Sequence, residues 1–155
     1  MPRIRTILSL AASAAAVLAL AAPAQAVPDD TYVIREPESG RCLTVLGDHL
    51  VGLGNCSIES AWKITNRGDG TVQIAESRNE ERCLRIAPPP VFPPFTDVGP
   101  CGTGPDRWRI RELGPEGAPV LITEAFRDGG LAPQGDRTIV RPGGGVPWDL
   151  LHIRR

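Results

Sequence analysis

The side chains that could do chemistry in this chain are four cysteines, two histidines and many carboxylates. His49 and His152 are the only near-neutral bases, and neither has a recognisably paired serine or cysteine nucleophile. Aspartate and glutamate together number 18, but no spacing singles out a pair that could act as general acid and base. The glycine run 143–145 lacks the lysine and following helix of a phosphate loop. The sequence therefore favours a binding protein over an enzyme.

Metal chemistry is also poorly supported, because a zinc site needs short clusters of cysteine and histidine. Only His49 lies near a pair of cysteines in the sequence. We therefore expect neither a metal nor a cofactor. In an exported protein, four cysteines favour two disulfides instead. The four are Cys42, Cys56, Cys83 and Cys101.

The first 26 residues have the pattern of a secretory signal peptide. Arg3 and Arg5 form a basic start, residues 7–22 are apolar, and Ala-Gln-Ala at 24–26 is a small-x-small cleavage site. The apolar run is shorter than the ~20 residues that a membrane-spanning helix requires. We therefore expect residues 1–26 to be removed, leaving a secreted, extracellular domain at 27–155 with no membrane segment.

Composition excludes other classes of protein. The chain is 41% hydrophobic with a formal net charge of −1, which does not suit a disordered chain. Nucleic-acid binding would need a high pI and clustered basic residues, and neither is present. At 155 residues the chain is too short for two ordinary domains. We expect one domain, acting as a monomer, with no nucleic-acid partner.

Three segments of the chain repeat one pattern. Each begins with six residues that alternate like a half-buried strand and end in glutamate, at 31–36, 71–76 and 119–124. A leucine follows, and each segment closes on a tryptophan with an aliphatic residue two positions later. We expect these residues to fill equivalent slots in the core rather than to stack against sugars. They are Leu43, Leu84, Leu131, Trp62, Trp108 and Trp148.

The segments between these landmarks are rich in turn residues, with 17 glycines and 16 prolines in the chain. No stretch after the signal keeps a helical apolar pattern for three turns. The sequence therefore predicts an all-β domain of three repeats of about 40 residues, at about 31–66, 71–112 and 119–155, with pseudo-threefold symmetry. Equivalent positions should pair within equivalent repeats, so the expected disulfides are Cys42–Cys56 and Cys83–Cys101.

The order of motifs in these segments resembles that of the ricin-B-like lectins, which are β-trefoils. The motifs are Cys-Leu near the second strand, a second cysteine, and a fourth strand with Trp-x-aliphatic. The resemblance implies the same disulfide pairing and a carbohydrate ligand outside the cell. It also implies a sugar-binding aspartate directly after Cys-Leu, but those positions hold Thr44, Arg85 and Ala132. The Gln-x-Trp motif has lost its glutamine in every repeat, so the pockets are expected to be degenerate. The first repeat offers the candidate sugar site Thr44, Asp48, His49 and Asn55.

The second repeat carries a proline-rich segment at 88–95, between Cys83 and Cys101. Its prolines favour an extended backbone, and a rigid loop tied at both ends loses little entropy on docking. The alternative function is therefore a secreted protease inhibitor or protein-binding trefoil that uses this loop. Its candidate contact residues are Pro90, Val91, Phe92 and Phe95. Two other hypotheses stay open. The two phenylalanines could fold back over the barrel mouth, or the protein could have a structural role with no small ligand.

Overall fold

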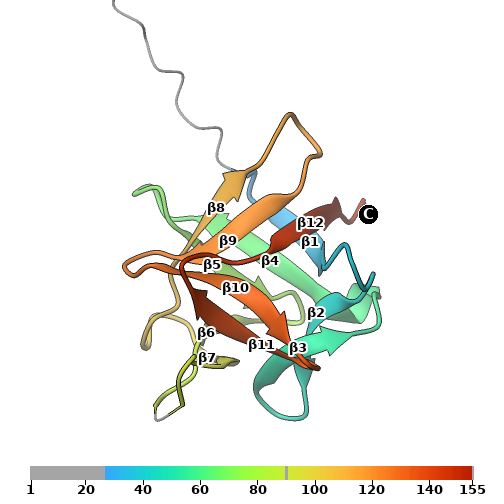
Figure 1. The fold of residues 1–155 in the computed structure, drawn as a ribbon. Helices are drawn as coiled ribbons and strands as arrows, with labels where there is room; N and C mark the ends of the chain where they lie inside the picture. The colour runs from blue at the N-terminus through green and yellow to red at the C-terminus, as the bar shows by residue number, and fades with distance from the viewer. Residues whose placement is uncertain (1–26, 90, 155) are drawn as a thin grey trace, which may run out of the picture.

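In a computed structural model, which describes residues 27–89 and 91–154, the chain forms twelve short strands and one 3-10 turn (Figure 1). The predicted signal peptide and Pro90 lie outside the described residues. The elements are β1 (Asp30–Arg35), β2 (Cys42–Leu46), β3 (Leu50–Gly54), η1 (Ile58–Ser60), β4 (Ala61–Asn66), β5 (Val72–Glu76), β6 (Asn79–Ile86), β7 (Thr96–Pro100), β8 (Trp108–Glu112), β9 (Val120–Glu124), β10 (Gly129–Gln134), β11 (Arg137–Pro142) and β12 (Pro147–His152).

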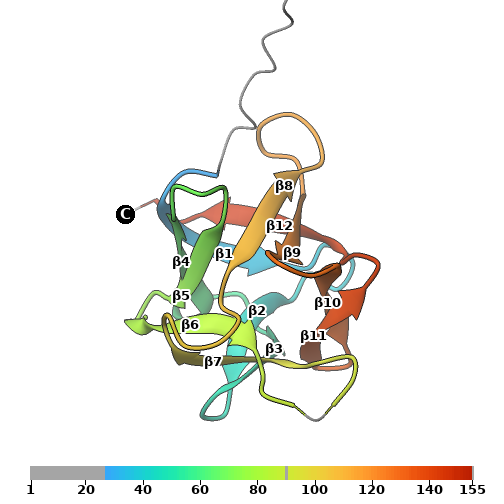
Figure 2. The same cartoon turned by 90° about the vertical axis from the view of Figure 1, so that its left-hand side faces the viewer.

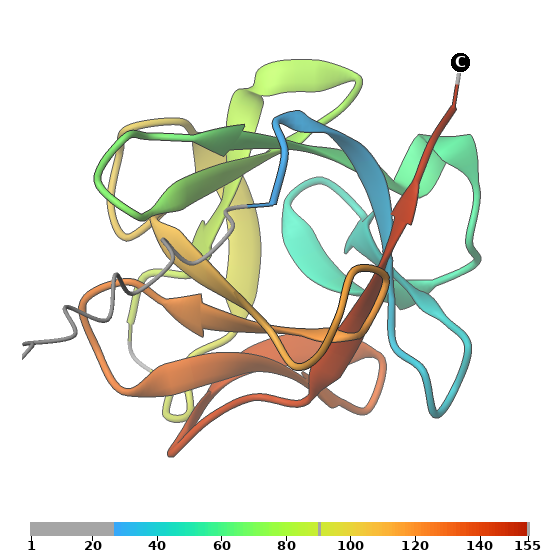
Figure 3. The same cartoon turned by 90° about the horizontal axis from the view of Figure 1, so that it is seen from above.

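Six strands close into a barrel. Antiparallel pairing runs from β1 to β4, β5, β8, β9 and β12, and β12 pairs back onto β1 with Tyr32 opposite His152. Figure 3 looks onto this ring from above. Closure removes the free edges that an open sheet would expose. The two ends of the described chain therefore meet along one seam of the barrel.

The remaining six strands form three hairpins, β2–β3, β6–β7 and β10–β11. They lie together at one end of the barrel, at the bottom of Figure 2. The hairpins also pair with one another, because Arg137 of β11 lies opposite Gly52 of β3, and Leu50 of β3 lies opposite Asp97 of β7. The hairpins therefore form a continuous cap, and a side chain in one of them can reach its neighbour.

The core is built on three equivalent contacts between barrel and cap. Each tryptophan is buried, and its indole Nε1 donates a hydrogen bond to the carbonyl oxygen of a leucine in a cap hairpin. The donor–acceptor distances are 2.9 Å for Trp62 to Leu43, 2.9 Å for Trp108 to Leu84, and 3.0 Å for Trp148 to Leu131. The prediction that these six residues form the core is confirmed. A buried indole N–H needs an acceptor, and the cap strands supply one each time.

Both predicted disulfides are confirmed. Cys42 pairs with Cys56 and Cys83 with Cys101, with Cα–Cα distances of 5.0 and 4.9 Å. In the third hairpin, Gly130 takes the place of the first cysteine. A Cβ at Gly130 would lie 2.0 Å from the backbone nitrogen of Gly145, so the chain itself fills the space of the missing bridge. The third hairpin is therefore held by backbone packing, and only glycine fits at position 130.

Candidate functional site

The residue that follows each Cys-Leu or Gly-Leu pair occupies an equivalent place in the three hairpins. The strand register sets Thr44 opposite Gly52, Arg85 opposite Asp97, and Ala132 opposite Ile139. Because side chains alternate along a strand, the leucine points into the core and the next residue points to the other face. The surroundings of these three positions can therefore be compared to see whether each hairpin has a pocket there.

The second hairpin fills this position with its own ion pair. Arg85 Nε lies 2.9 Å from Asp97 Oδ1, and Arg85 Nη2 lies 3.3 Å from Asp97 Oδ2. The guanidinium lies over Gly99, where an added Cβ would be 2.3 Å from Arg85 Cζ. Both partners are largely buried, with side-chain exposures of 21% and 5%. The groups that could bind a ligand here are already paired with each other.

The third hairpin is closed by apolar packing. Ala132 is fully buried, and Ile139 opposite it is also buried. Neither side chain can donate or accept a hydrogen bond. This position therefore offers a polar ligand nothing to bind.

The first hairpin leaves an open polar pocket, which we call the Thr44 cavity. Thr44 is only partly buried, and its side chain lines this pocket. The cavity measures about 230 Å³. It lies between β2, η1 and the end of β5, and its lining includes Thr44, Val45, Glu59, Ser60, Glu76 and Arg78.

Glu76 is the distinctive group in this cavity. Its Oε2 atom is buried and accepts no hydrogen bond with acceptable geometry, although Arg82 Nη1 lies 3.1 Å away as an ion-pair partner. Burial raises the pKa of the Glu76 carboxyl, and the charge of Arg82 opposes that shift only in part. Buried polar atoms are nearly always hydrogen-bonded, so this oxygen is an exception to the usual pattern.

The equivalent glutamates at the ends of β1 and β9 are satisfied by their own turns. Glu36 accepts the backbone N–H groups of Glu38 and Ser39, at 3.0 and 2.7 Å. Glu124 accepts the N–H of Phe126 at 3.2 Å. After Glu76, only two residues separate β5 from β6, and Asn79 already pairs with Glu76. The second turn is therefore too short to supply the same donors.

Of the predicted sugar-site residues, the structure places only Thr44 in the cavity. Asp48 and His49 lie in the exposed turn between β2 and β3, and Asn55 is exposed beyond the opposite end of the hairpin. The Asp48 carbonyl oxygen accepts a hydrogen bond from Arg82, so this turn reaches Glu76 only through that arginine. The four residues are thus close in sequence but spread along the hairpin.

The sequence does not predict Glu76 as a site residue, because Glu76 lies outside the positions that the resemblance to the lectins indicates. Glu36, Glu76 and Glu124 all end the repeated six-residue segments of the sequence. Only two residues separate β5, which ends at Glu76, from β6, and this short connection distinguishes Glu76 from the other two glutamates.

The proline-rich loop divides between exposed and packed residues. Phe92 and Val91 are 80% and 53% exposed. Phe95 is half-buried, bridges to Ile139, and lies under the Arg137 guanidinium at 5.1 Å from its ring centroid. A largely apolar cavity of about 570 Å³ lies beside the loop, and its lining includes Ile86, Pro88, Val91, Phe92, Arg127 and Val140. We call it the proline-loop cavity. One phenylalanine therefore anchors the loop and the other faces outward.

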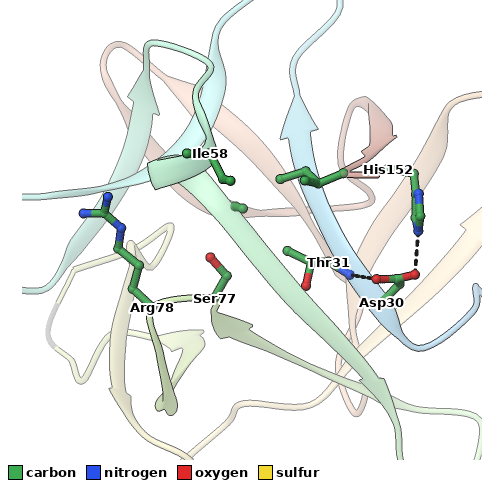
Figure 4. Close-up of a pocket in the computed structure, with 8 residues that line it drawn as sticks. Asp30, Thr31, Ile58, Ser77, Arg78 and His152 are labelled. Carbon is green, nitrogen blue, oxygen red and sulfur yellow. Dashed lines mark hydrogen bonds and ion pairs between the residues drawn. The ribbon is translucent and has the colours of Figure 1, made fainter. Parts of the chain in front are cut away.

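A third cavity, which we call the terminal cavity, lies where β1 meets β12 and measures about 570 Å³. Figure 4 shows Asp30 and His152 at one end, Arg78 at the other, and Thr31, Ser77 and Ile58 between them. His152 Nε2 lies 2.5 Å from Asp30 Oδ2, and the histidine ring contacts Tyr32 edge-on.

Within residues 27–89 and 91–154, no group of three or more histidine, cysteine, aspartate or glutamate side chains could hold a metal ion. Nor does any helix in the same ranges have the length and apolar character needed to cross a membrane.

No protein-family model matches the sequence, and no curated protein matches it significantly. Solved structures do match the fold. A designed threefold-symmetric protein, ThreeFoil, has a TM-score of 0.68 and 17% identity, and the match covers 79% of this chain and 99% of that one. A ricin B-like lectin from Macrolepiota procera, solved with lactose, has a TM-score of 0.65 and 15% identity over 83% and 99% of the two chains.

The same fold occurs in a protein that is not described as a lectin. A salivary protein from Culex quinquefasciatus, of a cysteine- and tryptophan-rich family, has a TM-score of 0.67 and 15% identity over 83% and 96% of the two chains. Identities this low speak to fold and not to ligand. The closed barrel, the hairpin cap and these matches together show that the chain is a β-trefoil similar in structure to the ricin B-like lectins.

Proposed function

We propose that this protein is a secreted, non-catalytic carbohydrate-binding module that holds a sugar in the Thr44 cavity. We further infer three repeats, at about 31–66, 71–112 and 119–155, of which the first holds the Thr44 cavity. The observation that carries the proposal is the small polar cavity lined by the Glu76 side chain, whose carboxylate has one buried oxygen without a hydrogen bond from the described residues. The matched lectin solved with lactose supports carbohydrate as the ligand class.

The chemistry of the cavity suits a sugar hydroxyl. A carboxylate accepts hydrogen bonds from two adjacent hydroxyls, and the Thr44 hydroxyl and the Arg78 guanidinium add a donor on each side. Val45, which packs against the core, offers an apolar surface to the C–H face of a ring. A volume of about 230 Å³ limits the occupant of this cavity to a single sugar unit.

The test is a glycan array with the full chain, followed by calorimetric titration of the best ligand. Glu76→Gln and Thr44→Ala should each weaken binding by about tenfold or more, since a hydrogen bond to a charged group is lost or weakened. Glu81→Gln makes the same chemical change at an exposed glutamate of β6 outside the cavity and should leave affinity unchanged. Flat binding across the array, or equal affinities for Glu76→Gln and Glu81→Gln, would overturn the proposal.

A second candidate function rests on the exposed Phe92 beside the proline-loop cavity. An outward aromatic on a loop framed by Cys83–Cys101 suits docking into the pocket of another protein, including a protease. Titration of serine and cysteine proteases with the wild type and Phe92→Ser would test this. If the protein acts this way, it should inhibit at least one enzyme, and the variant should not. The absence of inhibition, or equal inhibition by both proteins, would count against it.

A further inference from the structure

We propose that the sugar site continues from the Thr44 cavity into the terminal cavity, so that the ligand is an oligosaccharide rather than a single sugar. This inference rests on the proposed carbohydrate function and extends it. It assigns to Ser77, Thr31 and His152 a second subsite, which holds the units next to the one bound by Glu76. None of these three residues belongs to a hairpin pocket.

The two cavities adjoin each other. Both are lined by Ala61 and Arg78. Along the chain, Glu76 faces one cavity while Ser77 faces the other. Likewise, Ile58 lines the terminal cavity, and Glu59, the next residue of the same 3-10 turn, lines the Thr44 cavity. A ligand that leaves the Thr44 cavity past Arg78 therefore enters the terminal cavity directly.

The partition between them is a weak surface ion pair. Arg78 Nη2 lies 2.6 Å from Glu59 Oε1, and the two side chains are 63% and 67% exposed. Exposed pairs of this kind contribute little to stability, so a ligand can displace the pair at small cost. Once displaced, both side chains keep hydrogen-bonding capacity toward hydroxyl groups. Arg78 then faces a ligand that occupies either cavity.

The terminal cavity is lined by both polar and apolar groups, and a chain of sugars likewise presents hydroxyl groups and apolar C–H faces. Thr31 and Ser77 carry hydroxyls, and Asp30 with His152 forms a polar group at the far end from Arg78 (Figure 4). Ile58 is 68% exposed and supplies an apolar surface near the middle. Among the residues that the structure describes, Ser77 is hydrogen-bonded only through its backbone N–H, to the carbonyl of Ala61, so its side chain is available. The volume of about 570 Å³ exceeds that of the Thr44 cavity at about 230 Å³, so it admits more than one unit.

The experiment compares β-1,4-linked ladders of one, two and three units of galactose, glucose and xylose, each titrated against the full chain. For the sugar that binds, the trisaccharide should bind about tenfold more tightly than the monosaccharide, because added hydrogen bonds outweigh the ordering cost. Ser77→Ala and His152→Gln should remove most of this gain and leave monosaccharide affinity unchanged. Glu38→Gln, at an exposed glutamate outside both cavities, is the matched control and should retain the gain.

A measurement on the wild type gives the same answer without variants. The chain has only two histidines, so its imidazole proton spectrum can be followed residue by residue during titration. The His152 signals should shift with the trisaccharide and not with the monosaccharide, while His49 in the β2–β3 turn should stay unmoved with both. Equal affinity for one and three sugar units, or a His152 signal that does not shift with the trisaccharide, would overturn the extended site alone. Failure of every ladder to bind, together with flat binding across the glycan array, would overturn the carbohydrate function itself.

Discussion

The first and second hairpins of the cap are held in place in the same way, but they differ in the side chain after Cys-Leu. Both are closed by a disulfide and both accept the indole hydrogen bond of a core tryptophan. Thr44 lies opposite a glycine and borders a small polar cavity, whereas Arg85 lies opposite Asp97 and is ion-paired with it. The fold therefore provides the same location in each hairpin, and the cross-strand pair sets which polar groups there are free of a partner within the hairpin.

A second contrast, between Glu36 and Glu76, concerns the turn that follows rather than the strand. The same residue type ends both strands, but only the longer turn returns backbone N–H groups to the carboxylate. In the shorter turn, the carboxylate is left facing the cavity. A difference of a few residues in loop length thus separates a structural glutamate from a candidate ligand-binding one.

Breaking the ion pair of the second hairpin should have the largest effect. Arg85→Ala leaves the Asp97 carboxylate buried without its partner, so we expect the free energy of unfolding to fall by about 3 kcal/mol. Urea denaturation at neutral pH measures it. Thr44→Ala, the matched change in the first hairpin, should cost under about 1 kcal/mol because Thr44 is only partly buried.

The double variant Arg85→Ala/Asp97→Ala separates a lost attraction from an unpaired charge. It should recover much of the stability that the single change removes, since no charge stays buried. A single Arg85→Ala variant as stable as the wild type would show that this pair does not hold the second hairpin.

Removing the disulfides should show where the two hairpins are alike. Cys42→Ala/Cys56→Ala and Cys83→Ala/Cys101→Ala should each cost about 3 kcal/mol, because the closed loops are similar at 14 and 18 residues. Thermal unfolding measures both. Limited proteolysis should then differ, with faster cleavage within 88–95 in the second variant only. Equal cleavage of that loop in both variants would contradict the idea that Cys83–Cys101 frames it.

Placing the arginine of the second hairpin at the equivalent position of the first, as Thr44→Arg, should block the candidate site. Thr44→Arg places a long cation into the Thr44 cavity, so sugar affinity should fall by about tenfold or more while stability changes by under about 1 kcal/mol. Titration with the best array ligand and a denaturation curve give the two numbers. Thr44→Ser keeps the hydroxyl and should bind nearly as well as the wild type. Full binding by Thr44→Arg would place the sugar elsewhere.

The smallest effect is a difference in pH dependence between the two glutamates. Burial alone would raise the pKa of Glu36, but hydrogen bonds from Ser39 and Glu38 bring it below the ordinary value. Its contribution to stability is therefore complete above the ordinary glutamate pKa of about 4.3 and is lost as pH falls through the lowered pKa. The pKa of Glu76 is raised, chiefly by burial. Its contribution is present at low pH and is lost as pH rises through the raised pKa.

Stability curves from pH 2 to 8 should therefore change in opposite directions in the two variants. Glu36→Gln should lose stability mainly at neutral pH, and Glu76→Gln should gain relative to wild type there, each by roughly 1 kcal/mol or less. If both variants shift the curve in the same direction, the contrast between the two turns is wrong.

Much of the fold could be predicted from the sequence because its determinants are repeated and local. Strand alternation, turn residues and the three Leu and Trp positions indicated a β-trefoil core, and the repeat itself paired Cys42 with Cys56 and Cys83 with Cys101. The candidate site could be predicted only in part. Thr44 was found because it occupies a motif position. Asp48, His49 and Asn55 were grouped with it by sequence proximity, which a hairpin does not preserve at its two ends.

The sequence by itself determined which positions are equivalent, since the alternation of apolar residues and the spacing of the cysteines can be recognised directly in the chain. Only the tertiary structure decided what each equivalent position does. Whether Arg85 finds Asp97, whether Glu76 is left without turn donors, and whether Ser77 and His152 face one cavity all depend on cross-strand register and on barrel closure. Those contacts join residues far apart in the chain, and no local pattern specifies them.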